Sequence, residues 1–167
     1  MMEVAAQEKL ISVINEKFEG EIIEAGMVKD FLTLILKKEK IIDIIRHLYH
    51  HPEAKFQYLT TMFAVHYPDQ NQIAMVYQLH NLNTNQRIRL KIFLSADNPT
   101  TSTLTTVFSA ANWMEREAYD FFGVLFTGHP NLKRILNVED MLIFPMRKEY
   151  PLEDQTREDK NDLMFGR

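Results

Sequence analysis

The apolar positions in the first third of the chain follow two periods, one helical and one extended. Residues 4–18 place apolar side chains on one helical stripe and predict an amphipathic helix that ends before Gly20. Residues 21–25 and 31–36 read as two strands around a turn at Gly26, and the second is apolar enough to be a central strand. The chain therefore opens with a helix and a strand pair.

The next segment predicts a second helix and an antiparallel meander. Residues 41–48 carry apolar side chains at helical spacing, and Pro52 prevents the helix from continuing. Three strands are then predicted over residues 56–67, 73–79 and 87–94. The asparagine-rich residues 81–86 have the chemistry of a hairpin loop, so the last two strands should pair directly.

This order of elements predicts an α+β fold, with an antiparallel sheet and helices packed on one face. Residues 1–145 are expected to form a single domain. Residues 146–167 are mostly charged, with only two short apolar islands, and predict an extended C-terminal arm that docks on a neighbouring protein.

Composition narrows the possible functions. Cysteine is absent, which excludes disulfides and cysteine-ligated iron–sulfur clusters from this chain. The net charge of -4 argues against nucleic-acid binding. We expect no membrane span, because every apolar run is far shorter than the roughly 18 residues that a span needs. The first residues lack an export signal, so we expect a cytoplasmic protein.

Residues 112–122 predict a short helix with defined ends. Asn112 is a good N-cap residue, Glu115 stands where a capping box needs it, and Gly123 suits the C-terminal exit. Glu117 and Asp120 are three residues apart, so we expect these carboxylates to share one helix face.

The residues from position 115 onward form a long motif of mixed chemistry, E-R-E-x-Y-D-x-x-G-x-x-F-x-G-H-P-x-L-x-R-I-L. This motif resembles the signature of the 30 kDa-subunit family, the C subunits of proton-pumping NADH:quinone oxidoreductase, which is respiratory complex I. The resemblance covers roughly residues 30–152, with the signature segment at 111–136. His66 is one departure, since many relatives carry an aspartate just before the Tyr-Pro pair.

The resemblance implies a non-catalytic subunit of the peripheral arm that scaffolds the large quinone-site subunit. In the implied complex, electrons pass from NADH through FMN and iron–sulfur clusters of partner subunits to quinone, coupled to proton translocation. No catalytic residue, cofactor or metal is expected in this chain. Its expected place is the cytoplasmic face of the cell membrane, with membrane contact only through the complex.

The residues expected at the interface with partner subunits come from three segments. They are Arg87, Arg89 and Lys91 on a predicted strand, then Glu115, Arg116, Glu117, Tyr119, Asp120, Gly123, Phe126, Gly128, His129, Pro130, Leu132 and Arg134 of the signature, then Arg147, Lys148, Tyr150, Pro151 and Leu152 after it. The basic row on the strand fits an acidic partner and simple solvation about equally well.

Two other functions compete with this one. The chain could be the equivalent subunit of a related membrane-bound hydrogenase or ferredoxin-linked dehydrogenase. It could also be an independent hydrolase that uses Glu117, Asp120 and His129, although no pocket for a substrate is evident in the sequence. The histidines at 47, 50 and 51 have helical spacings that could offer two ligands to zinc, but no third ligand is evident. They are better explained as exposed residues near a helix end.

Overall fold

The computed structural model describes residues 2–29 and 31–150. Its elements are α1 (Met2–Asn15), β1 (Ile22–Val28), β2 (Phe31–Leu36), the 3-10 turn η1 (Lys38–Lys40), α2 (Ile41–His50), β3 (Tyr58–Tyr67), the 3-10 turn η2 (Pro68–Gln70), β4 (Gln72–Asn81), β5 (Gln86–Ser95), β6 (Thr100–Ser102), α3 (Ala111–Phe122) and β7 (Leu125–Thr127). The α+β class predicted from the sequence is confirmed.

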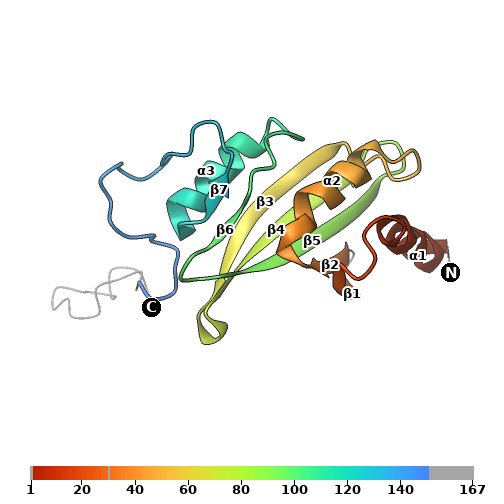
Figure 1. The fold of residues 1–167 in the computed structure, drawn as a ribbon, viewed down its shortest axis with the longest axis horizontal. Coiled ribbons are helices and arrows are strands. Elements are labelled where there is room, and N and C mark those ends of the chain that lie inside the picture. Colours follow the sequence, from red (N-terminus) through yellow and green to blue (C-terminus); the bar gives the residue numbers. More distant parts are fainter. Residues whose placement is uncertain (1, 30, 151–167) are drawn as a thin grey trace, which may run out of the picture.

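The five main strands form one sheet in the order β1-β2-β5-β4-β3. The meander of β3, β4 and β5 is antiparallel, as predicted. β2 runs parallel to β5, however, so the sheet is mixed rather than purely antiparallel. The reason is α2, which carries the chain across the sheet between β2 and β3 (Figure 1).

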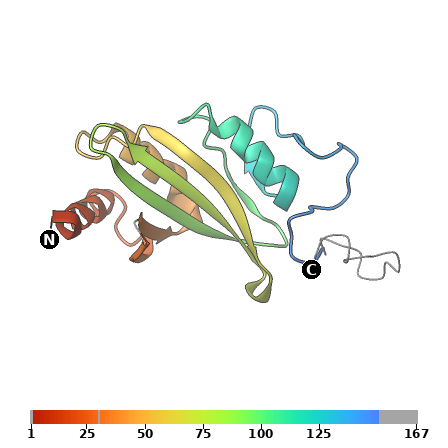
Figure 2. The same ribbon diagram turned by 180° about the vertical axis from the view of Figure 1, so that it is seen from behind.

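One face of the sheet carries the hydrophobic core. Leu34, Met75, Tyr77 and Leu90 come from three neighbouring strands and are fully buried there against the apolar stripe of α2. Burying a large apolar side chain of this kind contributes roughly 1.5–3 kcal/mol. Within the described residues, no helix covers the opposite face when the sheet is viewed from behind (Figure 2). This is the predicted arrangement of helices on a single face.

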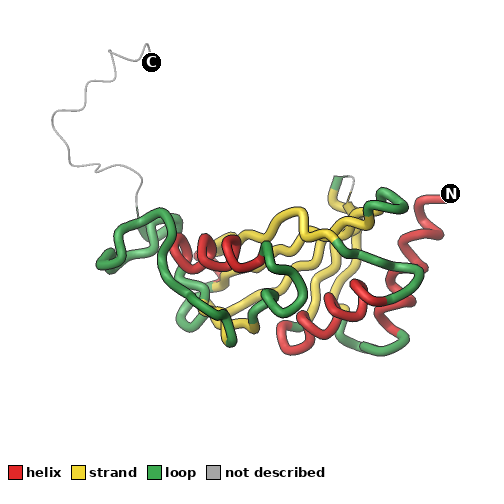
Figure 3. Tube along the Cα trace, turned by 90° about the horizontal axis from the view of Figure 1, so that it is seen from above, coloured by secondary structure: helices red, strands yellow, loops and turns green. Residues whose placement is uncertain are grey.

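The helices lie along the sheet in chain order. α1 lies at one end and α3 at the other, beside β3 (Figure 1), and α2 runs along one side of the strands (Figure 3). A second, two-stranded sheet pairs β6 with β7 in parallel and holds the segment before α3 next to the segment after it. No helix within residues 2–29 and 31–150 is long and apolar enough to cross a membrane.

Several local predictions need correction. The turn between the first two strands follows Val28 rather than Gly26, which lies inside β1; Lys29 adopts the left-handed conformation there. The first helix ends at Asn15, three residues before the predicted Phe18. His47 is not exposed, because its Nε2 lies 3.0 Å from the carbonyl oxygen of Val13 and joins α2 to α1.

The predicted arm begins as part of the domain. The backbone N–H of Met146 donates to the carbonyl of Phe121, and the backbone N–H of Lys148 donates to Nδ1 of the buried His66. The Nδ1 lone pair of His66 thus accepts a hydrogen bond from the first residues of the predicted arm. The rest of the arm, with Pro151 and Leu152, lies outside the described residues.

Candidate functional site

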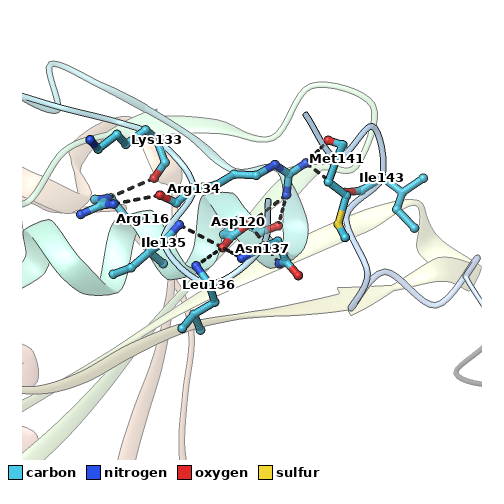
Figure 4. A network of polar contacts seen from close by, with 9 residues as sticks. All are labelled: Arg116, Asp120, Lys133, Arg134, Ile135, Leu136, Asn137, Met141 and Ile143. Atoms are coloured by element: carbon cyan, nitrogen blue, oxygen red, sulfur yellow. Dashed lines mark hydrogen bonds and ion pairs between the residues drawn. The ribbon is translucent and has the colours of Figure 1, made fainter. Parts of the chain in front are cut away.

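The signature residues converge on the irregular segment that follows β7, which we call the 131–150 loop. This segment contains no helix or strand. Polar side chains from α3 supply the hydrogen bonds that a regular element would otherwise provide. Figure 4 shows the resulting network.

Asp120 is the centre of this network. Its Oδ2 accepts hydrogen bonds from three successive backbone N–H groups, those of Ile135 (3.1 Å), Leu136 (2.7 Å) and Asn137 (2.9 Å). Its Oδ1 accepts from Nη1 of Arg134 at 2.8 Å and from Nδ2 of Asn137 at 3.0 Å. Burial alone would raise the pKa of Asp120, but these donors outweigh it and hold the pKa well below its usual range.

Arg134 extends the network to the far side of the loop. Its Nη1 also donates to the carbonyl of Asp120, and its Nη2 donates to the carbonyls of Met141 (2.6 Å) and Ile143 (3.0 Å). The guanidinium stacks on the ring of Phe144 with its carbon 5.1 Å from the ring centroid. One buried ion pair therefore fixes both sides of the loop.

Arg116 and Arg147 secure the two ends of the same loop. Nε and Nη2 of Arg116 donate to the carbonyls of Lys133 and Arg134, at 3.0 and 2.8 Å. Nε of Arg147 donates to the carbonyl of Phe122 at 2.8 Å. Each guanidinium thus satisfies main-chain acceptors that would otherwise be unpaired in a loop without secondary structure.

Gly123 allows the loop to approach α3. It ends the helix in the left-handed conformation, with φ 75°, and its N–H donates to the carbonyl of Tyr119. A Cβ at this position would stand 2.6 Å from the ring of Phe144. The predicted helix exit at Gly123 is confirmed, and the close approach adds a second reason for glycine.

Glu115 belongs to a separate buried cluster. It does not form the predicted capping box, since α3 begins at Ala111 without a side-chain cap and Asn112 lies inside the helix. The Glu115 carboxylate instead accepts from the hydroxyl of Thr103 at 2.7 Å and from the backbone N–H of Leu104. Burial raises the pKa of Glu115 to about 7, although both of these hydrogen bonds act to lower it.

His129 packs against Glu115, with its Nε2 3.9 Å from Oε2 of the carboxylate. The backbone N–H of Asn131 donates to Nδ1 of His129, so the proton of a neutral ring is on Nε2, which lies 3.1 Å from the carbonyl of Asn112. Gly128, just before it, also adopts a positive φ of 86°. This cluster joins the β6–β7 pair to the start of α3.

The three groups proposed for a hydrolase do not meet. Glu117 is exposed on α3, Asp120 is buried among the amides of the 131–150 loop, and His129 lies in the Glu115 cluster. The expectation that Glu117 and Asp120 share one face is wrong, because Asp120 faces the loop. Among the side chains of residues 7–29 and 31–150, no group of three potential metal ligands is assembled.

The outward side of the 131–150 loop exposes large apolar side chains. Leu136, Val138 and Leu142 are 68%, 64% and 94% exposed, and the neighbouring Ile135, Ile143 and Met146 are also exposed. Leu136 and Ile143 point away from the polar network (Figure 4). The loop therefore holds a polar network inside and exposes several large apolar side chains among charged ones, which is typical of a surface that another protein covers.

The predicted interface residues divide into distinct groups. Five are buried in this chain: Glu115, Arg116, Asp120, Phe126 and Arg134. Four are half-buried, namely Tyr119, Leu132, Arg147 and Tyr150, and three are exposed, namely Glu117, Pro130 and Lys148. The basic residues Arg87, Arg89 and Lys91 lie on the uncovered face of the sheet. Their contact with a partner stays a prediction. Sequence reasoning assigned none of Leu136 (the last residue of the signature), Val138 and Leu142 to the interface. Their only signal was short apolar stretches between polar residues, without helical or strand spacing.

The chain is similar to known proteins over most of its length. The chain is 33% identical over 159 residues to the C subunit of NADH-quinone oxidoreductase from Geotalea uraniireducens, covering 95% of this chain and 96% of that protein. It is 37% identical over 140 residues to the corresponding C 2 subunit from Rhizobium etli, covering 83% and 74%.

Two solved structures have a similar fold. One belongs to the membrane-bound sulfane sulfur reductase, an archaeal respiratory membrane complex, with a TM-score of 0.75 and 25% identity over 92% of this chain and 96% of that one. The other is the trypsin-resistant fragment (1–134) of Nqo5, with a TM-score of 0.60 and 26% identity over 75% and 98%. Residues 34–156 match the family described as respiratory-chain NADH dehydrogenase, 30 Kd subunit, and the chain belongs to that family.

Proposed function

We propose that this chain is a non-catalytic scaffold of the peripheral arm of an NADH:quinone oxidoreductase, and that its 131–150 loop docks on the large subunit that forms the quinone site. The chain itself holds no flavin, iron–sulfur cluster or quinone; FMN and the clusters are in partner subunits. Electrons pass from NADH through them to quinone. The chain meets the membrane only through the complex, at its cytoplasmic face.

The observation that carries this proposal is the set of exposed apolar side chains on the 131–150 loop, above its buried polar network. Arg134 and Asp120 form a buried pair that would leave an unpaired charge costing several kcal/mol if one partner were lost, so the loop is held rigidly. What this rigid backbone displays is Leu136, Val138 and Leu142. A preorganised apolar surface binds a partner without a further ordering cost in the loop.

The test is copurification from native membranes. A tagged chain with Leu136→Asp and Leu142→Asp should lose its partner subunits, because each leucine that a partner buries contributes roughly 1.5–3 kcal/mol. We expect a loss of at least about tenfold in recovered partner. Leu82→Asp is the matched control, since Leu82 is 67% exposed in the hairpin between β4 and β5. Equal recovery with the double variant and with the control would contradict the proposal.

A second candidate is the equivalent subunit of a related respiratory membrane complex with another electron donor. The similarity to a chain of the sulfane sulfur reductase complex, with the higher of the two TM-scores, favours it. The scaffold role is the same in both cases. The copurified complex decides between them: NADH oxidation by the recovered assembly supports the first candidate, and activity only with another donor supports the second.

A further inference from the structure

The uncovered face of the sheet has a chemistry of its own. We call it the outer face; it carries Phe31 and Thr33 of β2, Arg89, Lys91 and Phe93 of β5, Gln78 and Val76 of β4, and Phe63, Val65 and Tyr67 of β3. The strands β2, β3, β4 and β5 contain no aspartate or glutamate, and β1 adds one carboxylate on this face, Glu24 opposite Ile35, although the chain has 23 acidic residues against 19 lysines and arginines. An acidic protein thus presents a face that is locally basic.

The two central cations of this face are held in place by aromatic rings. The guanidinium carbon of Arg89 lies 4.7 Å from the ring centroid of Phe31. Nζ of Lys91 lies 4.5 Å from the centroid of Phe93 and 4.8 Å from that of Tyr67, and it donates to the Tyr67 hydroxyl at 3.1 Å. Cation–π contacts and a hydrogen bond therefore fix both side chains over the sheet before any partner arrives.

Neither cation has a counter-ion within the described part of the chain. No carboxylate of residues 7–29 or 31–150 forms a salt bridge with Arg89 or Lys91, and Nε of Arg89 is buried without a hydrogen-bond partner there. Arg134 and Arg147, by contrast, are paired with carboxylates in their own chain. The outer face keeps donors available in a half-buried, aromatic setting, where a charge-assisted hydrogen bond is stronger than in water.

We propose that the outer face is a second docking surface, and that its occupant is a carboxylate-bearing segment of a neighbouring protein subunit. Carboxylates of that segment pair with Arg89 and Lys91, and its apolar side chains cover Phe31, Phe93 and Phe63. Nucleic acid is a poorer occupant, because the chain has a net charge of -4 and the aromatic rings already lie beneath the cations. This inference rests on the proposed function in one respect, since it takes the partner to be a subunit of the same complex.

The first experiment uses salt. Arg89→Gln and Lys91→Gln together should lower retention of the chain in the isolated complex by roughly three- to tenfold at low salt, and should flatten the fall in retention as salt is raised. Lys38→Gln with Lys40→Gln removes the same charge from the exposed turn η1, away from this face, and should leave both unchanged. The same retention curve for the two double variants would overturn the proposal. Leu136→Asp with Leu142→Asp tests the other surface separately.

The second experiment locates the contact directly and does not use the charge variants. Gln78 of β4 stands opposite Arg89 in the sheet register and is half-buried on the outer face. A photo-reactive residue at position 78 in the assembled complex should yield an adduct with another polypeptide, at a peptide that contains aspartate or glutamate. Absence of an adduct, an adduct with residues 151–167 of this chain, or an adduct with a peptide lacking acidic residues would each overturn the proposal.

Discussion

Asp120→Asn is the change that tests the polar network most sharply. Asparagine keeps the shape of the side chain but replaces one carboxylate oxygen with an NH2 group. The native carboxylate accepts from Arg134 and Asn137 on one oxygen and from three backbone N–H groups on the other. An amide can serve only one of these donor sets, and its NH2 group then faces the donors of the other set.

The expected loss follows from the buried ion pair. Breaking one partner of such a pair costs about 3–5 kcal/mol, since Arg134 then keeps its charge without a carboxylate. The loop opens locally rather than with the whole domain, because the core of the sheet contains none of these groups. At 1.36 kcal/mol for each tenfold change, the amides of Ile135, Leu136 and Asn137 should exchange with solvent between about 10² and 10⁴ times faster.

Amide hydrogen exchange of the isolated chain measures this. Glu117→Gln is the control, because Glu117 lies on the same helix but is exposed, and it should change exchange at Leu136 by less than about threefold. Amides of β4 should keep their protection in both variants. Unchanged exchange at Leu136 in Asp120→Asn would refute the assigned role of the carboxylate, and equal acceleration in β4 would refute local opening.

Three further substitutions test other parts of the site. In the native chain, the raised pKa of Glu115, about 7, means that the folded state binds the proton more tightly than the unfolded state. The contribution of Glu115 to the free energy of unfolding should therefore fall by roughly 3 kcal/mol between about pH 4.5 and 7. Glu115→Gln should remove this pH dependence, as measured by denaturant unfolding. Gly123→Ala should release Phe144 from α3 and lower the melting temperature, through the strained φ and the 2.6 Å approach, whereas Phe144→Ala in the same chain should restore part of the loss. His66→Asn should keep an acceptor for the backbone N–H of Lys148, so this amide should still exchange slowly with solvent. His66→Leu removes the acceptor, which should speed the exchange and lower the free energy of unfolding by about 1–3 kcal/mol.

The regular elements were predictable because their side chains follow a period. The stripe of α2 and the alternation of Ile88, Leu90, Ile92 and Leu94 along β5 identify a helix and a half-buried strand without knowledge of any partner element. The parallel pairing of β2 with β5 has no such local signal. It depends on which strand edge the α2 crossover reaches, and that is decided by packing across the whole sheet.

The site was only partly predictable for the same reason. The signature marked Asp120 and Arg134, but three of the partners of Asp120 are backbone N–H groups, which any sequence supplies. Glu115 matched a capping-box spacing, yet its carboxylate bonds to Thr103 and Leu104, which approach α3 only through the β6–β7 pairing. The residue types indicated that polar side chains stabilise this region, but their hydrogen-bond partners are determined by the tertiary structure.

We expect the exposed apolar side chains of the 131–150 loop to lie against a neighbouring subunit. Leu142 is the best reporter, because its side chain is 94% exposed in this chain and takes no part in the polar network. A photo-reactive residue at position 142, irradiated in native membranes, should form an adduct with the large quinone-site subunit in high yield. Failure to form an adduct with any other polypeptide, in a complex that still contains this chain, would contradict the account.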